Sequence, residues 1–140
     1  MDDDRFPVEV VNGVSVVAAP EDIDATNSEE WQSALCEAAA RGTLVADLSR
    51  TEFCDASGLR ALLAARKRAE AAGGEVLLVA RSREVLRALA ITTIDRVIPR
   101  FTSLEEALAR TSANGPAAVG RANGGPPRQP SASRLNESAS

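Results

Sequence analysis

The fold is decided by the stretch Phe53-Cys54-Asp55-Ala56-Ser57-Gly58-Leu59-Arg60-Ala61-Leu62-Leu63, a polar turn between two apolar segments. Before it, Thr43-Leu44-Val45-Ala46-Asp47-Leu48 predicts a buried strand, and after it apolar residues recur with helical spacing. An acid, a hydroxyl and a glycine therefore stand where a strand passes into a helix. A helix N-terminus offers unpaired backbone N–H groups and the positive end of the helix dipole. Ser57 could serve there as a helix cap, a phosphate acceptor or a contact for a partner.

Length and composition favour one small domain. The chain has 140 residues, of which 44 % are hydrophobic and only 3 % aromatic, so its core must be mainly aliphatic. The net charge of -4 provides no electrostatic basis for binding nucleic acid. No apolar run reaches the roughly 18 residues that indicate a membrane span. The acidic start Met1-Asp2-Asp3-Asp4-Arg5 lacks the features of a secretory signal, so we expect a cytoplasmic protein without nucleic-acid or membrane partners.

The inventory of catalytic residues is poor. The chain contains no histidine, which removes histidine-dependent nucleophiles, histidine acid–base catalysis and most zinc sites. It also lacks a Walker-type phosphate loop and a G-x-G-x-x-G fingerprint. The two cysteines, Cys36 and Cys54, have no metal-ligand spacing. We therefore expect a protein that is not an enzyme and that holds neither a cofactor nor a metal ion.

Hydrophobic patterning predicts strands and helices in the order β-β-α-β-α-β-α-β-α. The predicted strands cover residues 8–11, 14–18, 44–48, 75–80 and 96–101. The predicted helices cover residues 28–41, 57–72 and 82–90, and a last helix begins at residue 103. Because strands separated by helices imply parallel pairing, we expect one α/β domain over residues 6–112 with a mixed, mainly parallel sheet. Residues 113–140 are rich in Gly, Pro, Ser and Asn, which predicts a disordered C-terminal tail.

Local signals mark the ends of several elements. Asn12-Gly13 between the first two strands is a strong hairpin signal. Asn27 with Glu30 three residues later forms a capping-box pattern, and Ser103-Leu104-Glu105-Glu106 repeats it before the last helix. Pro99 should place the final strand at an edge of the sheet or shorten it.

This order of elements, with Asp55-Ala56-Ser57-Gly58-Leu59 between the third strand and the second helix, resembles the STAS domain, named for sulfate transporters and anti-sigma factor antagonists. The most specific part of the resemblance is Val45-Ala46-Asp47-Leu48 followed by the stretch 53–63. Supporting parts are Ala71-Ala72-Gly73-Gly74-Glu75-Val76-Leu77-Leu78-Val79 and Phe101-Thr102-Ser103-Leu104-Glu105-Glu106-Ala107-Leu108. Since no membrane part is present, the chain is similar to the stand-alone bacterial antagonists rather than to the transporter tails.

The resemblance implies a partner switch. A family member of this kind binds an anti-sigma factor, which is usually also a serine kinase, and thereby releases a sigma factor. Phosphorylation of the turn ends the binding, since a phosphate adds about -1.5 to -2 charges. The family usually carries the phosphorylated hydroxyl directly after the aspartate, where this chain has Ala56, and only Ser57 keeps a hydroxyl. Either Ser57 takes over this role, or the protein binds its partner constitutively or under another signal.

The turn and the resemblance together define a candidate site. The residues expected to bind the partner are Asp55, Ala56, Ser57, Gly58 and Arg60, with Asp24 and Asn27 from the acidic connection that follows Pro20. Structural alternatives stand beside these roles. Asp55 or Ser57 could simply cap the helix, and Gly58 could allow a tight turn or a close approach. Arg60 could be an ordinary residue of a solvated helix face.

Two alternative functions stay open. The chain could be a STAS scaffold or sensor module in a stress complex, including one that binds a nucleotide or a lipid. It could also be controlled by oxidation of Cys36 and Cys54, whose simpler interpretation is two small, buried or half-buried residues. A disulfide between them would need Cα atoms within about 7 Å of each other.

Overall fold

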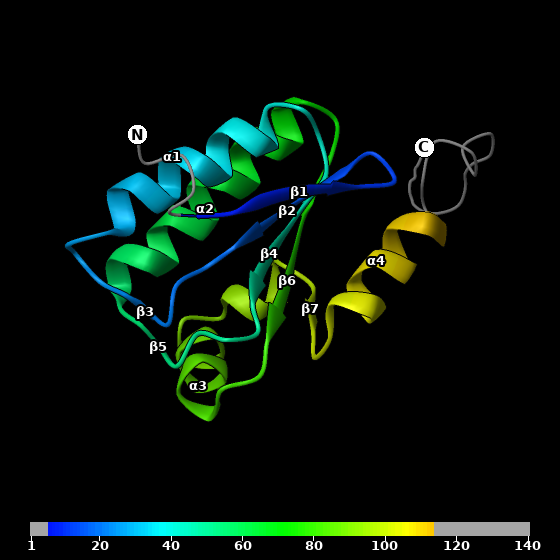
Figure 1. The fold of residues 1–140 in the computed structure, drawn as a ribbon. Coiled ribbons are helices and arrows are strands. Elements are labelled where there is room, and N and C mark those ends of the chain that lie inside the picture. Colours follow the sequence, from blue (N-terminus) through cyan, green and yellow to red (C-terminus); the bar gives the residue numbers. More distant parts are fainter. Residues whose placement is uncertain (1–5, 114–140) are drawn as a thin grey trace. The chain divides into compact units, whose positions relative to one another are not determined.

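The elements follow the predicted α/β order with two short strands added. The computed structural model describes residues 6–113. In chain order the elements are β1 (Val8–Val11), β2 (Val14–Ala18), β3 (Asp22–Ile23), α1 (Ser28–Ala39), β4 (Leu44–Leu48), β5 (Phe53–Cys54), α2 (Ala56–Ala71), β6 (Val76–Ala80), α3 (Arg83–Ile91), the 3₁₀ helix η1 (Ile94–Arg96), β7 (Arg100–Phe101) and α4 (Leu104–Ala113) (Figure 1). A boundary between two units of the chain falls between Ala107 and Leu108, and the sheet belongs to the first unit.

The main sheet has five strands in the order β1-β2-β4-β6-β7. β1 and β2 are antiparallel, whereas the other neighbouring strands are parallel, which confirms the predicted mixed, mainly parallel sheet. The β1–β2 hairpin turns at Asn12 and Gly13, whose φ angles are 52° and 82°. Two successive positive φ angles suit a two-residue hairpin, and Asn and Gly adopt them at low cost. The hairpin signal therefore predicted this turn correctly.

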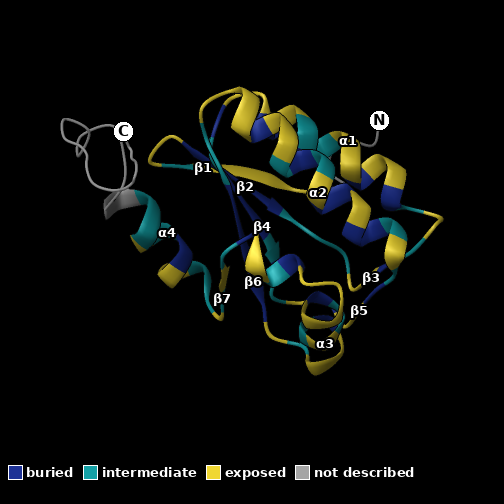
Figure 2. Ribbon diagram, turned by 180° about the vertical axis from the view of Figure 1, so that it is seen from behind, coloured by how far each residue is buried: buried dark blue, intermediate teal, exposed yellow. Residues whose placement is uncertain are grey.

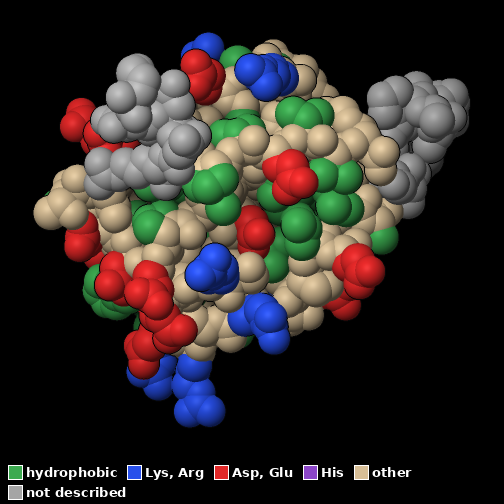
Figure 3. All heavy atoms as spheres, in the orientation of Figure 1, with side chains coloured by type: hydrophobic (Ala, Val, Ile, Leu, Met, Phe, Trp, Pro, Cys, Tyr) green, Lys and Arg blue, Asp and Glu red, His purple; other side chains and the backbone are tan. Residues whose placement is uncertain are grey.

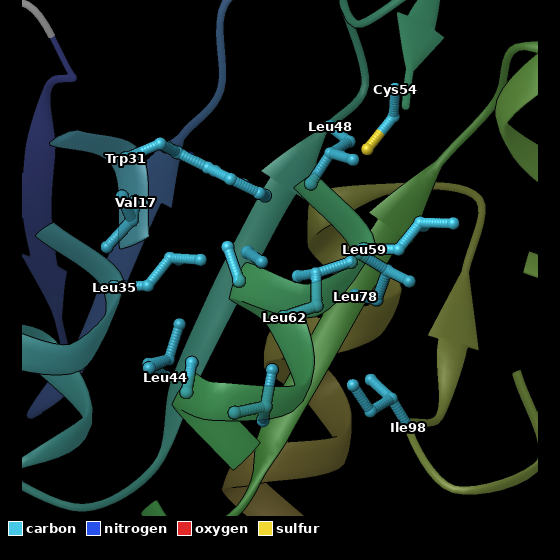
Figure 4. Close-up of a cluster of buried hydrophobic side chains, with 14 of the residues drawn as sticks. Val17, Trp31, Leu35, Leu44, Leu48, Cys54, Leu59, Leu62, Leu78 and Ile98 are labelled. Carbon is cyan, nitrogen blue, oxygen red and sulfur yellow. The ribbon is translucent and has the colours of Figure 1, made fainter. Parts of the chain in front are cut away.

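The core lies between the sheet and the helices α1 and α2. β6 is buried at every position and β4 at all but one, which confirms the buried strand predicted before the turn. Figure 2 shows these strands in the buried colour, while the outer sides of α1 and α2 are exposed. The large buried side chains that meet there, labelled in Figure 4, are Val17, Trp31, Leu35, Leu44, Leu48, Leu59, Leu62 and Leu78.

The predicted strand over residues 96–101 is wrong for most of its length. Only Arg100–Phe101 forms a strand, β7, at the edge of the sheet. Thr93 adopts a left-handed conformation and opens η1, whose Ile94 is buried together with Ile98 four residues later. This spacing buries both isoleucines from a helical turn rather than from an extended chain. Pro99, which has no N–H to donate, stands directly before the shortened strand.

The second capping box is displaced by one residue. The Ser103 hydroxyl accepts a hydrogen bond from the backbone N–H of Glu106 at 3.1 Å, as predicted. The Glu106 carboxylate, however, accepts from the backbone N–H of Thr102 at 3.3 Å and from its hydroxyl at 3.0 Å. Thr102 offers two donors to the carboxylate, which explains the shift.

The C-terminal tail stays a prediction. Ala113, the first residue assigned to it, ends α4, and residues 114–140 lie outside the described part of the chain. Within residues 6–113, none of the helices combines the length and the hydropathy that crossing a membrane requires.

Candidate functional site

Two strands of two residues each join the loop after β2 to the turn before α2. β3 and β5 pair in parallel, with Asp22 opposite Phe53 and Ile23 opposite Cys54. The backbone N–H of Asp55 extends this ladder by donating to the Ile23 carbonyl at 3.0 Å. The acidic segment 21–24 was predicted as a plain connection, which is wrong because half of it forms β3. A strand of two residues is too short to show an alternating pattern.

The base of the turn is anchored on two sides. The Thr51 hydroxyl, which is buried, donates to the Pro20 carbonyl at 2.7 Å. The Glu52 carbonyl accepts from the Ser82 hydroxyl at 3.0 Å, and Ser82 also caps α3 by accepting from Val85 N–H. Three loops that are distant in the sequence are thereby tied together beneath the turn.

Asp55 is the N-cap of α2. Its Oδ1 accepts from the backbone N–H groups of Ser57 at 2.8 Å and Gly58 at 3.3 Å. The Ser57 hydroxyl also donates to Oδ1, at 2.5 Å. The bond from this hydroxyl is the main reason why the pKa of Asp55 lies below its ordinary value, and the positive charge of Arg60 acts in the same direction. The alternative in which Ser57 caps the helix is therefore wrong, because Ser57 is the second helical residue.

Gly58 is required by packing inside the protein. A Cβ atom at this position would lie 2.5 Å from Cys54 Sγ and 2.7 Å from Ile23 Cγ2, closer than real atoms approach. Gly58 is itself buried. The glycine therefore lets α2 start directly against the β3–β5 pair, and it offers no side chain to a partner.

The outer side of the turn presents Ala56, Arg60 and Phe53, which are all exposed. Phe53 is 50 % exposed, whereas Cys54 next to it is buried, as expected for successive residues of a strand. Phe53 was not among the predicted site residues. The signal that could have identified Phe53 is an aromatic side chain in a chain with few aromatic residues, at a strand position that alternates with Cys54.

Asn27 does not cap α1 with its side chain, although it occupies the N-cap position. Its Oδ1 accepts from Asp24 N–H at 3.0 Å, and its Nδ2 donates to the Asp22 carbonyl at 2.9 Å. The predicted capping box at Asn27 is therefore wrong. The amide bonds to the backbone of the β3 loop in place of the helix N-terminus.

Asp24 lies beside Asp55, since each directly follows a residue of the Ile23–Cys54 pair. Its carboxylate accepts from the backbone N–H of Thr26 at 2.9 Å and from the Thr26 hydroxyl. The bond from the Thr26 hydroxyl is the largest of the effects that hold the pKa of Asp24 below its ordinary value, while repulsion from Asp55 acts the other way. The structure thus brings Asp24 and Asn27 to the same surface as the turn.

Both cysteines are free thiols in the structure. Cys54 points into the core cluster (Figure 4), and burial together with the nearby charge of Asp55 raises the pKa of its thiol to about 12. A thiol of this kind is protonated at neutral pH and is a poor nucleophile. Cys36 is half-buried in α1. Among residues 6–113, no three carboxylate or thiol side chains are grouped so that they could hold a metal ion.

The surface around the turn is acidic. Figure 3 shows acidic side chains gathered over β3 and β5, with basic side chains next to them over α3. The exposed acidic residues in these strands or directly before them are Glu21, Asp22 and Glu52. A partner that docks here must supply cations or leave these carboxylates in water.

Comparison with known proteins agrees with this arrangement. The chain is 31 % identical over 100 residues to the anti-sigma-F factor antagonist RsfA of Mycobacterium tuberculosis, over 69 % of this chain and 78 % of that protein. An anti-sigma factor antagonist from Mycobacterium paratuberculosis has a similar structure, with a TM-score of 0.71 and 30 % identity over 76 % of this chain and 92 % of that chain. The unphosphorylated antagonist SpoIIAA shares the fold, with a TM-score of 0.67 and 21 % identity over 77 % of this chain and 96 % of that chain.

The family resemblance is confirmed over the whole sheet. The model of the STAS domain matches residues 5–107, which include every strand and the helices α1 to α3. This protein belongs to the STAS domain family.

Proposed function

We propose that this protein is a cytoplasmic, non-enzymatic anti-sigma factor antagonist, which binds an anti-sigma factor and so releases a sigma factor for transcription. The observation that carries the proposal is the 31 % identity to the antagonist RsfA over 69 % of the chain. The second mycobacterial antagonist, with 30 % identity, supports it with a similar structure.

The contact would be made by a docking surface that combines the turn and the β3 loop. It consists of Phe53, Asp55, Ala56, Ser57 and Arg60, with Asp24 and Asn27. Phe53 is the apolar anchor of this surface, because it is half-exposed beside polar groups. The carboxylates of Asp24 and Asp55 would meet basic groups of the partner. Gly58 supports the surface from beneath.

Ser57 would be the switch, and a serine kinase, in the simplest case the anti-sigma factor itself, would modify it. A phosphate on Ser57 Oγ removes the donor that now bonds to Asp55. It also places about -1.5 to -2 charges beside the Asp55 carboxylate. The helix N-terminus tolerates this charge well, so the fold should survive. The docking surface would change its charge and lose the geometry of the turn, and the partner would leave.

The test is calorimetric titration of the full chain against purified anti-sigma factors encoded in the same genome. Wild type and Ser57→Ala should bind, while Ser57→Asp should bind at least about tenfold more weakly, or about 1.4 kcal/mol. The matched control is Ser33→Asp, because Ser33 is an exposed serine on α1. If no anti-sigma factor binds wild type, antagonism is refuted. Unchanged binding of Ser57→Asp would leave antagonism intact and would instead indicate a constitutive binder.

A further inference from the structure

Two turns of the same construction lie at the docking surface. One is Ile23-Asp24-Ala25-Thr26 and the other is Cys54-Asp55-Ala56-Ser57. Both follow a strand of two residues, and the two strands pair in register, with Ile23 opposite Cys54. Asp24 and Asp55 therefore occupy equivalent positions at the ends of neighbouring parallel strands.

The equivalence extends to individual atoms. Asp24 Oδ1 accepts from Thr26 N–H at 2.9 Å and from the Thr26 hydroxyl at 2.5 Å. Asp55 Oδ1 accepts from Ser57 N–H at 2.8 Å and from the Ser57 hydroxyl at 2.5 Å. Each aspartate thus holds one hydroxyl, two residues later in the chain, at the surface.

The two hydroxyl residues differ in accessibility. Thr26 is exposed, whereas Ser57 is half-buried and is followed by the buried Gly58. A kinase must take the acceptor hydroxyl into its own active site, so Thr26 is the more accessible substrate of the two. In both turns an alanine stands directly after the aspartate, and the hydroxyl is therefore found only at the next position.

We propose that Thr26 is a second phosphorylation site of the docking surface and is modified by a serine/threonine kinase. In the reaction, Thr26 Oγ1 attacks the γ-phosphorus of a nucleoside triphosphate and forms the new P–O bond. The bond from this phosphorus to the bridging oxygen breaks, and its electron pair leaves on the nucleoside diphosphate. The hydroxyl proton passes to a base of the kinase. The regulatory part of this inference rests on the proposed function, since it assumes that the surface binds an anti-sigma factor.

A phosphate on Thr26 would change the conformation of the β3 loop. It removes the hydroxyl donor of Asp24 and repels the Asp24 carboxylate. Asp24 N–H also bonds to Asn27 Oδ1, so movement of Asp24 disturbs the Asn27 side chain. Both residues belong to the docking surface, and we expect the partner to be released as it would be by a phosphate on Ser57.

The first experiment locates the phosphate without any partner. The full chain is isolated from its own cells in growth and in stress, digested with trypsin and analysed by fragment-ion mass spectrometry. Thr26 lies in the peptide 6–41 and Ser57 in the peptide 51–60, so the two sites separate at once. We expect phosphate on Thr26 in wild type, in Ser57→Ala and in the control Thr92→Ala, which alters another exposed threonine. A peptide 6–41 without phosphate on Thr26 in every condition overturns the proposal.

The second experiment measures binding and separates the two proposals. Thr26→Glu should bind the anti-sigma factor at least about tenfold more weakly than Thr26→Val, because both variants lose the hydroxyl donor to Asp24 and only Thr26→Glu adds a negative charge. If wild type binds and Thr26→Glu binds equally well, the regulatory part of the inference fails and antagonism stands. If Thr26 carries phosphate but no anti-sigma factor binds wild type, antagonism fails while the modification site stands.

Discussion

Gly58 lies against Cys54 so closely that a Cβ atom on the glycine would be 2.5 Å from the cysteine sulfur. In a helix, alanine is favoured over glycine by about 1 kcal/mol, so Gly58→Ala would be stabilising if space allowed it. The collision with Cys54 and Ile23 should outweigh this gain and lower the free energy of unfolding by about 1–3 kcal/mol. Urea denaturation measures the change.

The double variant Cys54→Ala/Gly58→Ala is the control for this explanation. Removing the sulfur relieves the shorter of the two contacts. Gly58→Ala should therefore cost less stability in the Cys54→Ala background than it costs in wild type. A stability of Gly58→Ala equal to that of wild type would show that the start of α2 can shift away from Cys54.

The Asp55 cap should make stability depend on pH. Asp55→Ala should cost about 1 kcal/mol at neutral pH, as is usual for a lost N-cap. Because the Ser57 hydroxyl lowers the pKa of Asp55 in the folded state, the carboxylate stabilises the fold fully above the unfolded value of 3.8. This contribution is lost as the pH falls through the lower pKa of the folded state. The difference between wild type and Asp55→Ala should therefore shrink below pH 3.8.

Ser57→Ala is the matched variant for this pH dependence. It removes the main cause of the lowered pKa but keeps the carboxylate and the backbone bonds to Asp55. Acid should then cost the variant less stability than it costs wild type. Denaturation series at several pH values measure how the free energy of unfolding changes with pH in wild type and in Ser57→Ala. An equal change in both proteins would contradict the role given to the hydroxyl.

Phe53 should contribute to binding but little to stability. Phe53 is 50 % exposed beside the turn, so Phe53→Ala should change the free energy of unfolding only slightly. Loss of an aromatic anchor from an interface typically weakens binding tenfold or more, which is about 1.4 kcal/mol. Calorimetry against the anti-sigma factor measures this loss. Ile91→Ala is the control, since Ile91 is 73 % exposed on α3 and lies outside the docking surface.

The fold could be predicted where the chain carries a repeated pattern. The bounds of β1, β2 and β4 agree with the prediction residue for residue, because these segments are apolar runs with clear turn signals between them. The strand prediction over Val97 and Ile98 was wrong because these residues carry no such pattern. A short apolar run fits an extended chain and a helical turn equally well, and only the packing of Ile98 against the core distinguishes the two.

Most residues of the candidate site could be predicted from the sequence, but the contacts among them could not. The Asp55 turn could be identified from the order of an acid, a hydroxyl and a glycine. The approach of Asp24 to Asp55 followed only from the family resemblance, because two strands of two residues leave no pattern. Asn27 was misassigned because its amide could bond either to the helix or to the loop. Which of these bonds forms depends on the distances from the Asn27 amide to the backbone groups of the helix and of the loop. The sequence does not contain these distances.

The thiol of Cys54 should react far more slowly than that of Cys36. Burial and the Asp55 charge raise the pKa of Cys54 to about 12, so almost none of it is thiolate at pH 8, whereas Cys36 is only half-buried. Alkylation of the folded protein with iodoacetamide, followed by peptide mass spectrometry, should label the peptide 6–41 before the peptide 51–60. In urea the two rates should become similar, because unfolding exposes both thiols. Equal rates in the folded protein would mean that Cys54 opens readily to solvent, and control of the docking surface by oxidation would then gain support.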